Sequence, residues 1–376
     1  PVLFDPPAMP LPGEGAQLAI VRAAAALGTL ALVRVEEWTE NLDRYAGSIA
    51  PVLTTDDDPQ AAPVQAILRA ARLVEIDAEF EEDPAALAPY ARELEALNPQ
   101  AVIAVRLPLG PDSADQIERL AAEGVAMVHL CADEVGYELE GNGSGFVADG
   151  LQMVHQQLVE ANLRDQVTLV VSGGIAAAEH VPKALVCGAD AVAVDLALQV
   201  ALGCALWADV RRPCPVEDLE TDATWGEQRI VNLMAAWRDQ LLEVLGAMGM
   251  REVCRLRGEL GRTIFQSKEE GEFRSLLQRT VSDHPAASLP EPGDGEVEGD
   301  LRWPTTLILA TAEQARTGQP PTSGLQYRVG RSGGGFDRLR FLFELDELPH
   351  SQSTEPRTPN LALDLNRRDA TRPCIQ

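Results

Sequence analysis

Two neighbouring loops in the middle of the chain carry the residues with the clearest chemistry. An apolar run, Val167 to Val171, ends in Ser172-Gly173-Gly174, and the next apolar run, Ala191 to Val194, ends at Asp195. Glycines after a strand let backbone N–H groups come close to a phosphate. A carboxylate within about 4 Å of a phosphate costs several kcal/mol unless the acid takes up a proton. The first loop therefore predicts anion binding, and the second opposes it.

Asp195 also has a purely structural interpretation. It precedes the helix-like sequence LALQVALGC, and an acidic residue at that position commonly caps a helix. The two interpretations are compatible, because a capping carboxylate at the anion position would fill the site from within.

The elements that must position these loops alternate along the chain. Short apolar runs rich in β-branched residues are separated, for the most part, by Ala/Leu-rich stretches with helical spacing. This pattern predicts a (β/α)8 barrel of the TIM type, in which the loops after the last two strands often hold a phosphate. The early intervals are short for that fold, so we expect some shortened or missing helices, and a doubly wound open sheet is the structural alternative. The eight runs are PVLF at the start, Ala26 to Val35, Ser48 to Leu53, Arg72 to Asp77, Ala101 to Leu107, Val125 to Cys131, Val167 to Val171 and Ala191 to Val194.

The composition changes after the barrel region, for which we expect residues 1–281. Residues 282–300 are rich in Pro, Gly and acids and are typical of a linker. Residues 301–348 contain short apolar pieces that predict a small β-containing appendage. Residues 349–376 are polar and proline-punctuated, and we expect an extended arm that is disordered alone or lies over a partner.

The overall charge limits the partners. The chain has 376 residues and a formal net charge of −27, which repels nucleic acid and anionic lipid. No apolar run reaches the roughly 18 residues that a membrane span needs. Six scattered cysteines do not form a disulfide framework and favour a cytoplasmic setting. We therefore expect small molecules or other protein subunits as partners, the latter held through the linker and the arm.

The segment from Asn162 to Cys214 also resembles a known family. LRDQVTLVVSGGI, GADAVAVDLALQVALGC and RRPCP are similar to the FMN-binding barrel domain of glutamate synthase, and DPAALAPYARELEALNPQAVIAVRL and RIVN extend the likeness. The resemblance implies an α/β barrel in which the loop at Ser172, Gly173 and Gly174 and the turn after the next strand hold the FMN phosphate. It also implies that Arg106 stands where the family has a lysine facing the flavin ring.

The chain departs from the family pattern at the positions that would face FMN. Asp195 and Leu196 replace the glycine and threonine of the second phosphate turn. The stretch from Cys131 to Tyr137 lacks the family's histidine and paired glycines and belongs to an acidic loop, 133–140. Arg106 keeps the positive charge, and we expect it in an internal ion pair, with Asp195 as one partner to consider, or at the surface. We therefore predict a relic FMN site blocked by Asp195, and no cofactor, with FMN as the alternative.

The metal ligands of the family are incomplete as well. The resemblance implies three cysteines around a three-iron cluster, but only Cys204 and Cys214 remain and Val210 stands at the middle position. We interpret the two cysteines as relic cluster ligands without a metal. The five histidines show no pair at metal-ligand spacing, and we assign none of them a role.

Three functions remain open. The first is a degenerate relative of the glutamate synthase barrel that has lost its catalytic residues and cofactors and serves as a structural or assembly subunit of a larger, redox-related complex. The second is an active FMN-dependent oxidoreductase of that family without the cluster. The third is a barrel that binds a different, cationic or phosphate-free ligand at the acidic loop. We favour the first, because the departures fall on cofactor-facing positions.

Overall fold

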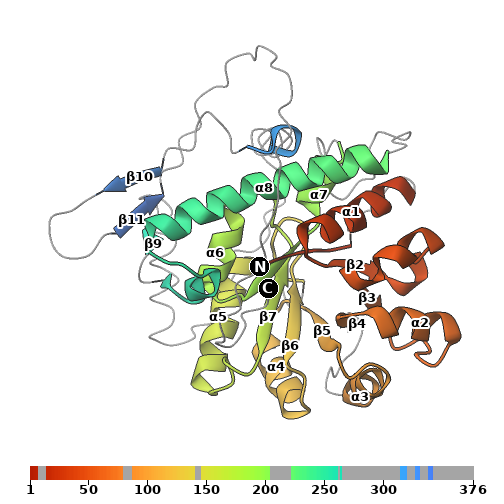
Figure 1. The fold of residues 1–376 in the computed structure, drawn as a ribbon. Coiled ribbons are helices and arrows are strands. Elements are labelled where there is room, and N and C mark those ends of the chain that lie inside the picture. The colour runs from red at the N-terminus through yellow and green to blue at the C-terminus, as the bar shows by residue number, and fades with distance from the viewer. Residues whose placement is uncertain are drawn as a thin grey trace, which may run out of the picture.

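The computed structural model shows a closed barrel of eight parallel strands in chain order, β1 to β8, with helices around it (Figure 1). It describes residues 1–6, 14–78, 87–139, 145–203, 222–260, 263–264, 314–319, 327–330 and 338–341. Each strand pairs with its sequence neighbours, and β1 closes the barrel against β8. The predicted (β/α)8 barrel is thus confirmed, and the open-sheet alternative is wrong.

The eight apolar runs of the sequence are the eight barrel strands. The strands are β1 (Val2–Phe4), β2 (Ala31–Arg34), β3 (Ile49–Leu53), β4 (Leu73–Asp77), β5 (Val102–Pro108), β6 (Met127–Cys131), β7 (Thr168–Ser172) and β8 (Ala191–Val194). The helices are α1 (Glu14–Leu27), α2 (Ala62–Ala70), α3 (Ala88–Leu97), α4 (Ser113–Ala122), α5 (Val147–Glu160), α6 (His180–Cys187), α7 (Leu196–Ala201) and α8 (Ala223–Ala247).

The short early intervals have the predicted consequence. No α-helix joins β2 to β3; two 3₁₀ segments, Val35–Glu37 and Glu40–Ser48, make the connection. Further along the chain, α8 is the longest described helix and lies beside α1 (Figure 1). The first and last helices of the barrel therefore pack together, which closes the ring of helices where the chain has gone once around.

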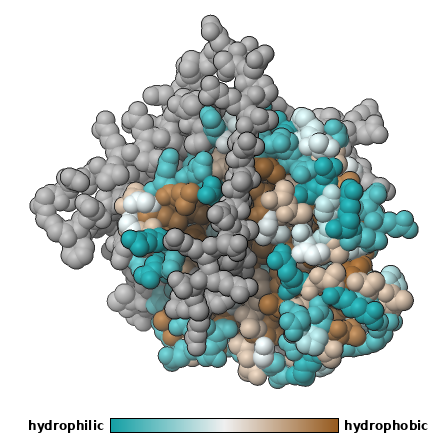
Figure 2. Space-filling model, viewed as in Figure 1, coloured by the Kyte–Doolittle hydropathy of each residue, from teal (hydrophilic) through white to brown (hydrophobic). Residues whose placement is uncertain are grey.

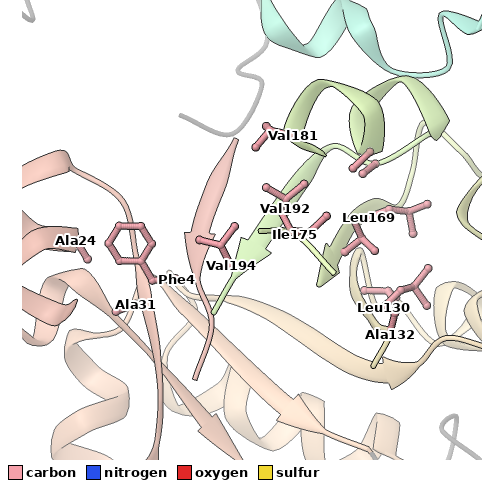
Figure 3. Close-up of a cluster of buried hydrophobic side chains, with 14 of the residues drawn as sticks. Phe4, Ala24, Ala31, Leu130, Ala132, Leu169, Ile175, Val181, Val192 and Val194 are labelled. Carbon is pink, nitrogen blue, oxygen red and sulfur yellow. The ribbon is translucent and has the colours of Figure 1, made fainter. Parts of the chain in front are cut away.

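The apolar core has two parts, because alternate residues of a strand face opposite sides. The larger part lies between the strands and the surrounding helices, where Phe4 of β1 packs near Ala24 of α1 and Ala31 of β2 (Figure 3). The smaller part fills the inside of the barrel. Its members are Leu3, Leu32, Ala50, Val52, Leu73, Ala104, Met127, Val170, Ala191 and Ala193. Small residues at several of these positions allow a compact apolar layer in the barrel interior.

The rest of the chain is described only in short pieces. β9 (Thr263–Ile264), β10 (Tyr327–Gly330) and β11 (Arg338–Phe341) form a three-stranded sheet in the order β10-β11-β9. Gln314 is buried and accepts a hydrogen bond from the indole Nε1 of Trp237 on α8, at 3.1 Å. The predicted linker 282–300 and arm 349–376 lie outside the described residues, so the proposed domain division stays a prediction.

The described surface is mixed in polarity. In the view of Figure 2, hydrophilic residues cover much of it, with hydrophobic residues gathered near the centre of that face. None of the described helices combines the length and the apolar character that crossing a membrane requires.

Candidate functional site

The inside of the barrel changes from apolar to charged along the strands. Glu75, Arg106 and His129 lie two residues beyond Leu73, Ala104 and Met127 of the inner apolar layer, so they face the same side of their strands. The strand register places Arg106 beside His129. This charged layer lies toward the carboxyl ends of the strands, the end at which (β/α)8 barrels carry their active sites. The barrel mouth is therefore the candidate site.

Four side chains at this level form a continuous network, called the mouth network here. The guanidinium of Arg106 donates one hydrogen bond to Asp5, directly after β1, and a second to Oε1 of Glu75 on β4, at 2.6 Å. The other carboxylate oxygen of Glu75 lies 2.9 Å from Nδ1 of His129 on β6. Glu75 and His129 are fully buried, Asp5 is 6% exposed, and the Arg106 side chain is 14% exposed. With His129 protonated, two positive and two negative charges cancel.

The electrostatics of the mouth network favour the charged forms. Burial raises the pKa of Glu75, but Arg106 and His129 outweigh it and hold that pKa at about 2. Burial also acts to lower the pKa of Arg106 and of His129. Neighbouring groups, Asp5 and Cys131 for Arg106 and Cys131 and Glu75 for His129, raise both pKa values above their ordinary range. The ion pairs of the network therefore persist at neutral pH.

Asp195 lies at the same mouth but outside this network. It is the N-cap residue of α7 by position, yet its side chain makes no cap hydrogen bond. The residue is 7% exposed, and its Oδ1 has no hydrogen-bond partner in the described part of the chain. Burial and then the nearby Asp5 carboxylate raise the pKa of Asp195 to about 7. The expected carboxylate is thus present at the mouth, but it exchanges a proton near neutral pH.

The predicted ion pair of Arg106 is present with other partners. Asp195 is one expected partner, but the guanidinium contacts Asp5 and Glu75 instead. Glu75 lies on β4, which pairs with the strand of Arg106, β5, and Asp5 follows β1. Both carboxylates were missed in the sequence, and so was the role of His129. A signal was available: Glu75, Arg106 and His129 are ionisable residues inside apolar strand runs, and such groups require partners when buried.

The glycine loop at the end of β7 is tightly packed by the chain itself. Ser172 is buried, and Gly173 and Gly174 have φ angles of 89° and 71°. A Cβ at Gly173 would lie 2.4 Å from the carbonyl oxygen of Ala132, and one at Gly174 would lie 2.7 Å from Cα of Gly136. The two glycines are therefore required by the close approach of the loop after β6, whether or not an anion binds there.

The acidic loop after β6 is an ordered turn where it is described, up to residue 139. Oδ1 of Asp133 accepts hydrogen bonds from the backbone N–H groups of Val135 and Tyr137, at 2.9 and 2.8 Å. Burial and then Asp149 raise the pKa of Glu138. Asp133 thus stabilises its own loop, and Glu140 lies outside the described residues.

The cysteines give a mixed outcome. Cys204, Val210 and Cys214 lie outside the described residues, so their interpretation as a relic of a cluster site stays a prediction. Cys131 and Cys187 are free and buried. Cys254 is disulfide-bonded, which the sequence gave no reason to expect.

A second buried polar network, called the base network here, lies at the amino ends of β7 and β8. Arg164 donates to Nδ1 of His155, to the carbonyl oxygens of Val167 and Gly188, and to Oδ2 of Asp190, at 2.6 to 3.0 Å. Asp190 also accepts from the backbone N–H of Leu169 and from Arg257, at 2.8 and 2.9 Å. Burial and then the adjacent Arg164 lower the pKa of His155 to about 4, so this ring is a neutral acceptor. The base network joins α5, β7, β8 and the segment after α8.

The mouth does not match the phosphate group of FMN, the cofactor that the sequence resemblance implies. The backbone N–H groups of Gly173 and Gly174 donate to no described residue and could donate to an anion. Two features oppose a bound anion. Asp195 brings a buried carboxyl group to the other half of the site, and carboxylates already accept from Nε and Nη2 of Arg106. An incoming phosphate would meet little uncompensated positive charge.

Comparison with known proteins gives a family match for part of the chain. Residues 86–251 match the family model described as a conserved region in glutamate synthase. An archaeal glutamate synthase [NADPH] of Methanocaldococcus jannaschii is 37% identical over 120 residues, which are 29% of this chain and 23% of that protein. The corresponding protein of Archaeoglobus fulgidus is 29% identical over 165 residues, covering 38% and 32%. The chain thus spans about a quarter to a third of the length of these relatives.

A longer relative and a solved structure complete the comparison. The glutamate synthase [NADPH] large chain of Azospirillum brasilense is 28% identical over 257 residues, covering 61% of this chain and 16% of that protein. A crystal structure of the monotopic membrane protein (S)-mandelate dehydrogenase matches with a TM-score of 0.47 at 14% identity, over 68% of this chain and 79% of that one. A likeness at that level supports no functional conclusion.

Proposed function

We propose that this divergent member of the glutamate synthase family is a barrel without cofactor chemistry that serves as a structural or assembly subunit of a larger, redox-related complex. The observation that carries the proposal is the closed charge balance of the mouth network. Arg106, which stands where the family has a lysine facing the flavin, is bound by Asp5 and Glu75 within the same barrel. The positive charge of Arg106 is therefore already neutralised by carboxylates of the barrel itself.

Asp195 adds to this argument. Its carboxyl group is buried at the turn where the family holds phosphate, and its raised pKa indicates that the surroundings already disfavour negative charge. A phosphate placed there would add to the charge that the site disfavours. The packing of residues 132–136 on Gly173 and Gly174 also supports the proposal, because contacts within the chain are enough to fix the glycine loop.

An active FMN-dependent oxidoreductase is the alternative function. One observation favours it: the N–H groups of Gly173 and Gly174 have no partner in the described part of the chain. If FMN bound there, those two amides would hold the phosphate. The flavin would then supply hydride or electron transfer, while Arg106 would lie near its ring, as the family resemblance implies.

The visible spectrum of the purified full chain, before and after incubation with FMN, separates the two functions. We expect a colourless protein that retains no flavin through gel filtration. The matched variant is Asp195→Asn, which keeps the shape of the side chain and removes its charge. Weak flavin binding by this variant alone would identify the carboxylate as the barrier. A yellow wild-type protein that keeps stoichiometric FMN would overturn the proposal.

The structural role requires partners, which we propose are protein subunits held through residues 282–300 and 349–376 in the cytoplasm. The basis is the composition of these segments, which provides little apolar surface for independent folding. Affinity purification from the source cells, with the full chain and with a variant that ends at residue 281, tests this. We expect the full chain to co-purify with defined subunits and the shortened chain to lose them. A full chain that is monomeric in every extract would contradict the role.

A further inference from the structure

Three buried side chains at the barrel mouth have the composition of a metal site. The three residues are Asp5, which follows β1, Glu75 in the middle of β4 and His129 in the middle of β6. Each offers one ligand atom, and the three atoms lie within 4.8 Å of one another. Two carboxylates and one imidazole form a donor set that suits divalent transition metals such as Zn²⁺ and Co²⁺. All three residues are less than one-tenth exposed.

The guanidinium of Arg106 already bridges two members of this group. Its Nη2 donates to Oδ1 of Asp5, and its Nε donates to Oε1 of Glu75, so a single cation holds the two carboxylates together. This is the role that a bound metal ion has in a carboxylate site. The guanidinium cannot also pair with the protonated ring of His129, because both groups have only donors.

His129 provides a second, independent observation. Its Nδ1 lies 2.9 Å from Oε2 of Glu75, but its Nε2 is fully buried without a hydrogen-bond partner among the described residues. An unpaired polar atom at such depth costs about 1–3 kcal/mol. The described side-chain contact of this buried ring is therefore the one to Glu75 through Nδ1, the nitrogen on the side of the carboxylates.

The charges are equivalent in the two arrangements. Asp5 and Glu75 carry two negative charges, which one divalent cation neutralises. In this chain the same two positive charges come from Arg106 and from a proton on His129. Exchanging both for a metal ion leaves the net charge of the buried layer unchanged.

We infer that Asp5, Glu75 and His129 form a three-ligand site for a divalent transition metal, and that the guanidinium of Arg106 fills this site in place of the ion. The wild-type protein is then closed to metal at the mouth, and loss of the Arg106 side chain opens the site. The barrel mouth is thus a cation site that a side chain of the same protein occupies. This inference does not depend on the proposed function.

The test uses the full chain with Arg106→Met, which keeps an unbranched apolar stem in place of the arginine stem and removes the charged group. Without metal we expect a lower melting temperature than in wild type, because two buried carboxylates lose their partner. Zn²⁺ should restore most of the loss, and Co²⁺ should give visible d–d absorption with one ion per chain and a micromolar Kd. Wild type should show neither response at the same metal concentration.

Two controls keep the result specific. The double variant Arg106→Met, His129→Asn removes the imidazole ligand and should lose at least tenfold in Co²⁺ affinity, which excludes binding to the acidic surface. Arg106→Gln, which retains a neutral NH2 donor group, is measured in the same way in case the methionine variant is unstable. The inference is overturned if the folded variants bind Co²⁺ no better than wild type, or if neither variant folds even when Zn²⁺ is present.

Discussion

The two buried networks of the barrel differ in how completely their polar atoms are paired. In the base network, Arg164 makes hydrogen bonds with two side chains and two backbone carbonyl groups, and both oxygens of Asp190 accept hydrogen bonds. At the mouth, Nε2 of His129 and Oδ1 of Asp195 are buried without described partners. The polar atoms of the base network are therefore paired, whereas two buried polar atoms at the mouth have no partner in the described part of the chain.

Buried charge alone does not distinguish the two networks. Both networks contain an arginine, a carboxylate and a histidine, and both shift the pKa of the histidine. The two pKa values move in opposite directions. Burial and Arg164 lower the pKa of His155 and keep its ring neutral, whereas Cys131 and Glu75 raise the pKa of His129 and favour its protonated form. Unsatisfied atoms, rather than charge or perturbed pKa values, distinguish the mouth.

The largest effect is expected from Arg164→Met in the base network. Removing the guanidinium takes away the donor that the carbonyl oxygens of Val167 and Gly188 share. Asp190 also loses the bond from Arg164 and keeps those from Leu169 and Arg257. We expect a loss of about 3–5 kcal/mol in the free energy of unfolding, measured by urea denaturation at pH 7. Arg164→Lys is the matched control and should recover part of the loss. A loss below about 1 kcal/mol for the methionine variant would show that the base network is not a structural joint.

The opposite sign is expected at the mouth for Asp195→Asn. The pKa of Asp195 is raised to about 7 in the folded chain from its ordinary value of 3.8. The folded state therefore binds more protons than the unfolded state between these values, and wild type loses stability as the pH rises through this window. The variant lacks this loss.

The stability gain of Asp195→Asn over wild type should thus be larger at pH 8 than at pH 5, by about 2 kcal/mol. Denaturant unfolding of both proteins at the two pH values measures it. Equal gains at both pH values, or a loss at pH 8, would show that the Asp195 carboxylate is well stabilised in the fold. In that case the contrast between mouth and base would disappear.

The smallest effect is expected for Gly173→Ala, compared with Gly28→Ala. Both glycines have positive φ angles, 89° and 72°, but only Gly173 has backbone atoms at the position of an added Cβ. We expect Gly173→Ala to cost about 1–2 kcal/mol more than Gly28→Ala in thermal unfolding, because the loop after β6 must move. Equal costs would indicate that the glycine loop is open at the mouth, as a phosphate site would be.

Much of the fold could be predicted from the sequence. The eight apolar runs gave all eight barrel strands, because a buried parallel strand must be apolar on both faces and turn residues end it. The site was predicted in part: Asp195 at the mouth and an internal ion pair of Arg106. The partners of Arg106 could not be predicted, because Asp5 is 101 residues away in sequence and Glu75 is 31 away. The pairing of β4 with β5 brings Glu75 to Arg106, and closure of the barrel brings Asp5 to it.

The eight strands in their order and the family resemblance follow from the sequence, because they depend on local pattern and on residue identity. The tertiary structure alone decided which charges meet. It joined Arg106 to Asp5 and Glu75 rather than to Asp195, and it left Asp195 and one nitrogen of His129 unpaired. The physical reason is that Coulomb energies and desolvation depend on distance and burial, and both are set by how β1, β4, β5, β6 and β8 come together around one axis.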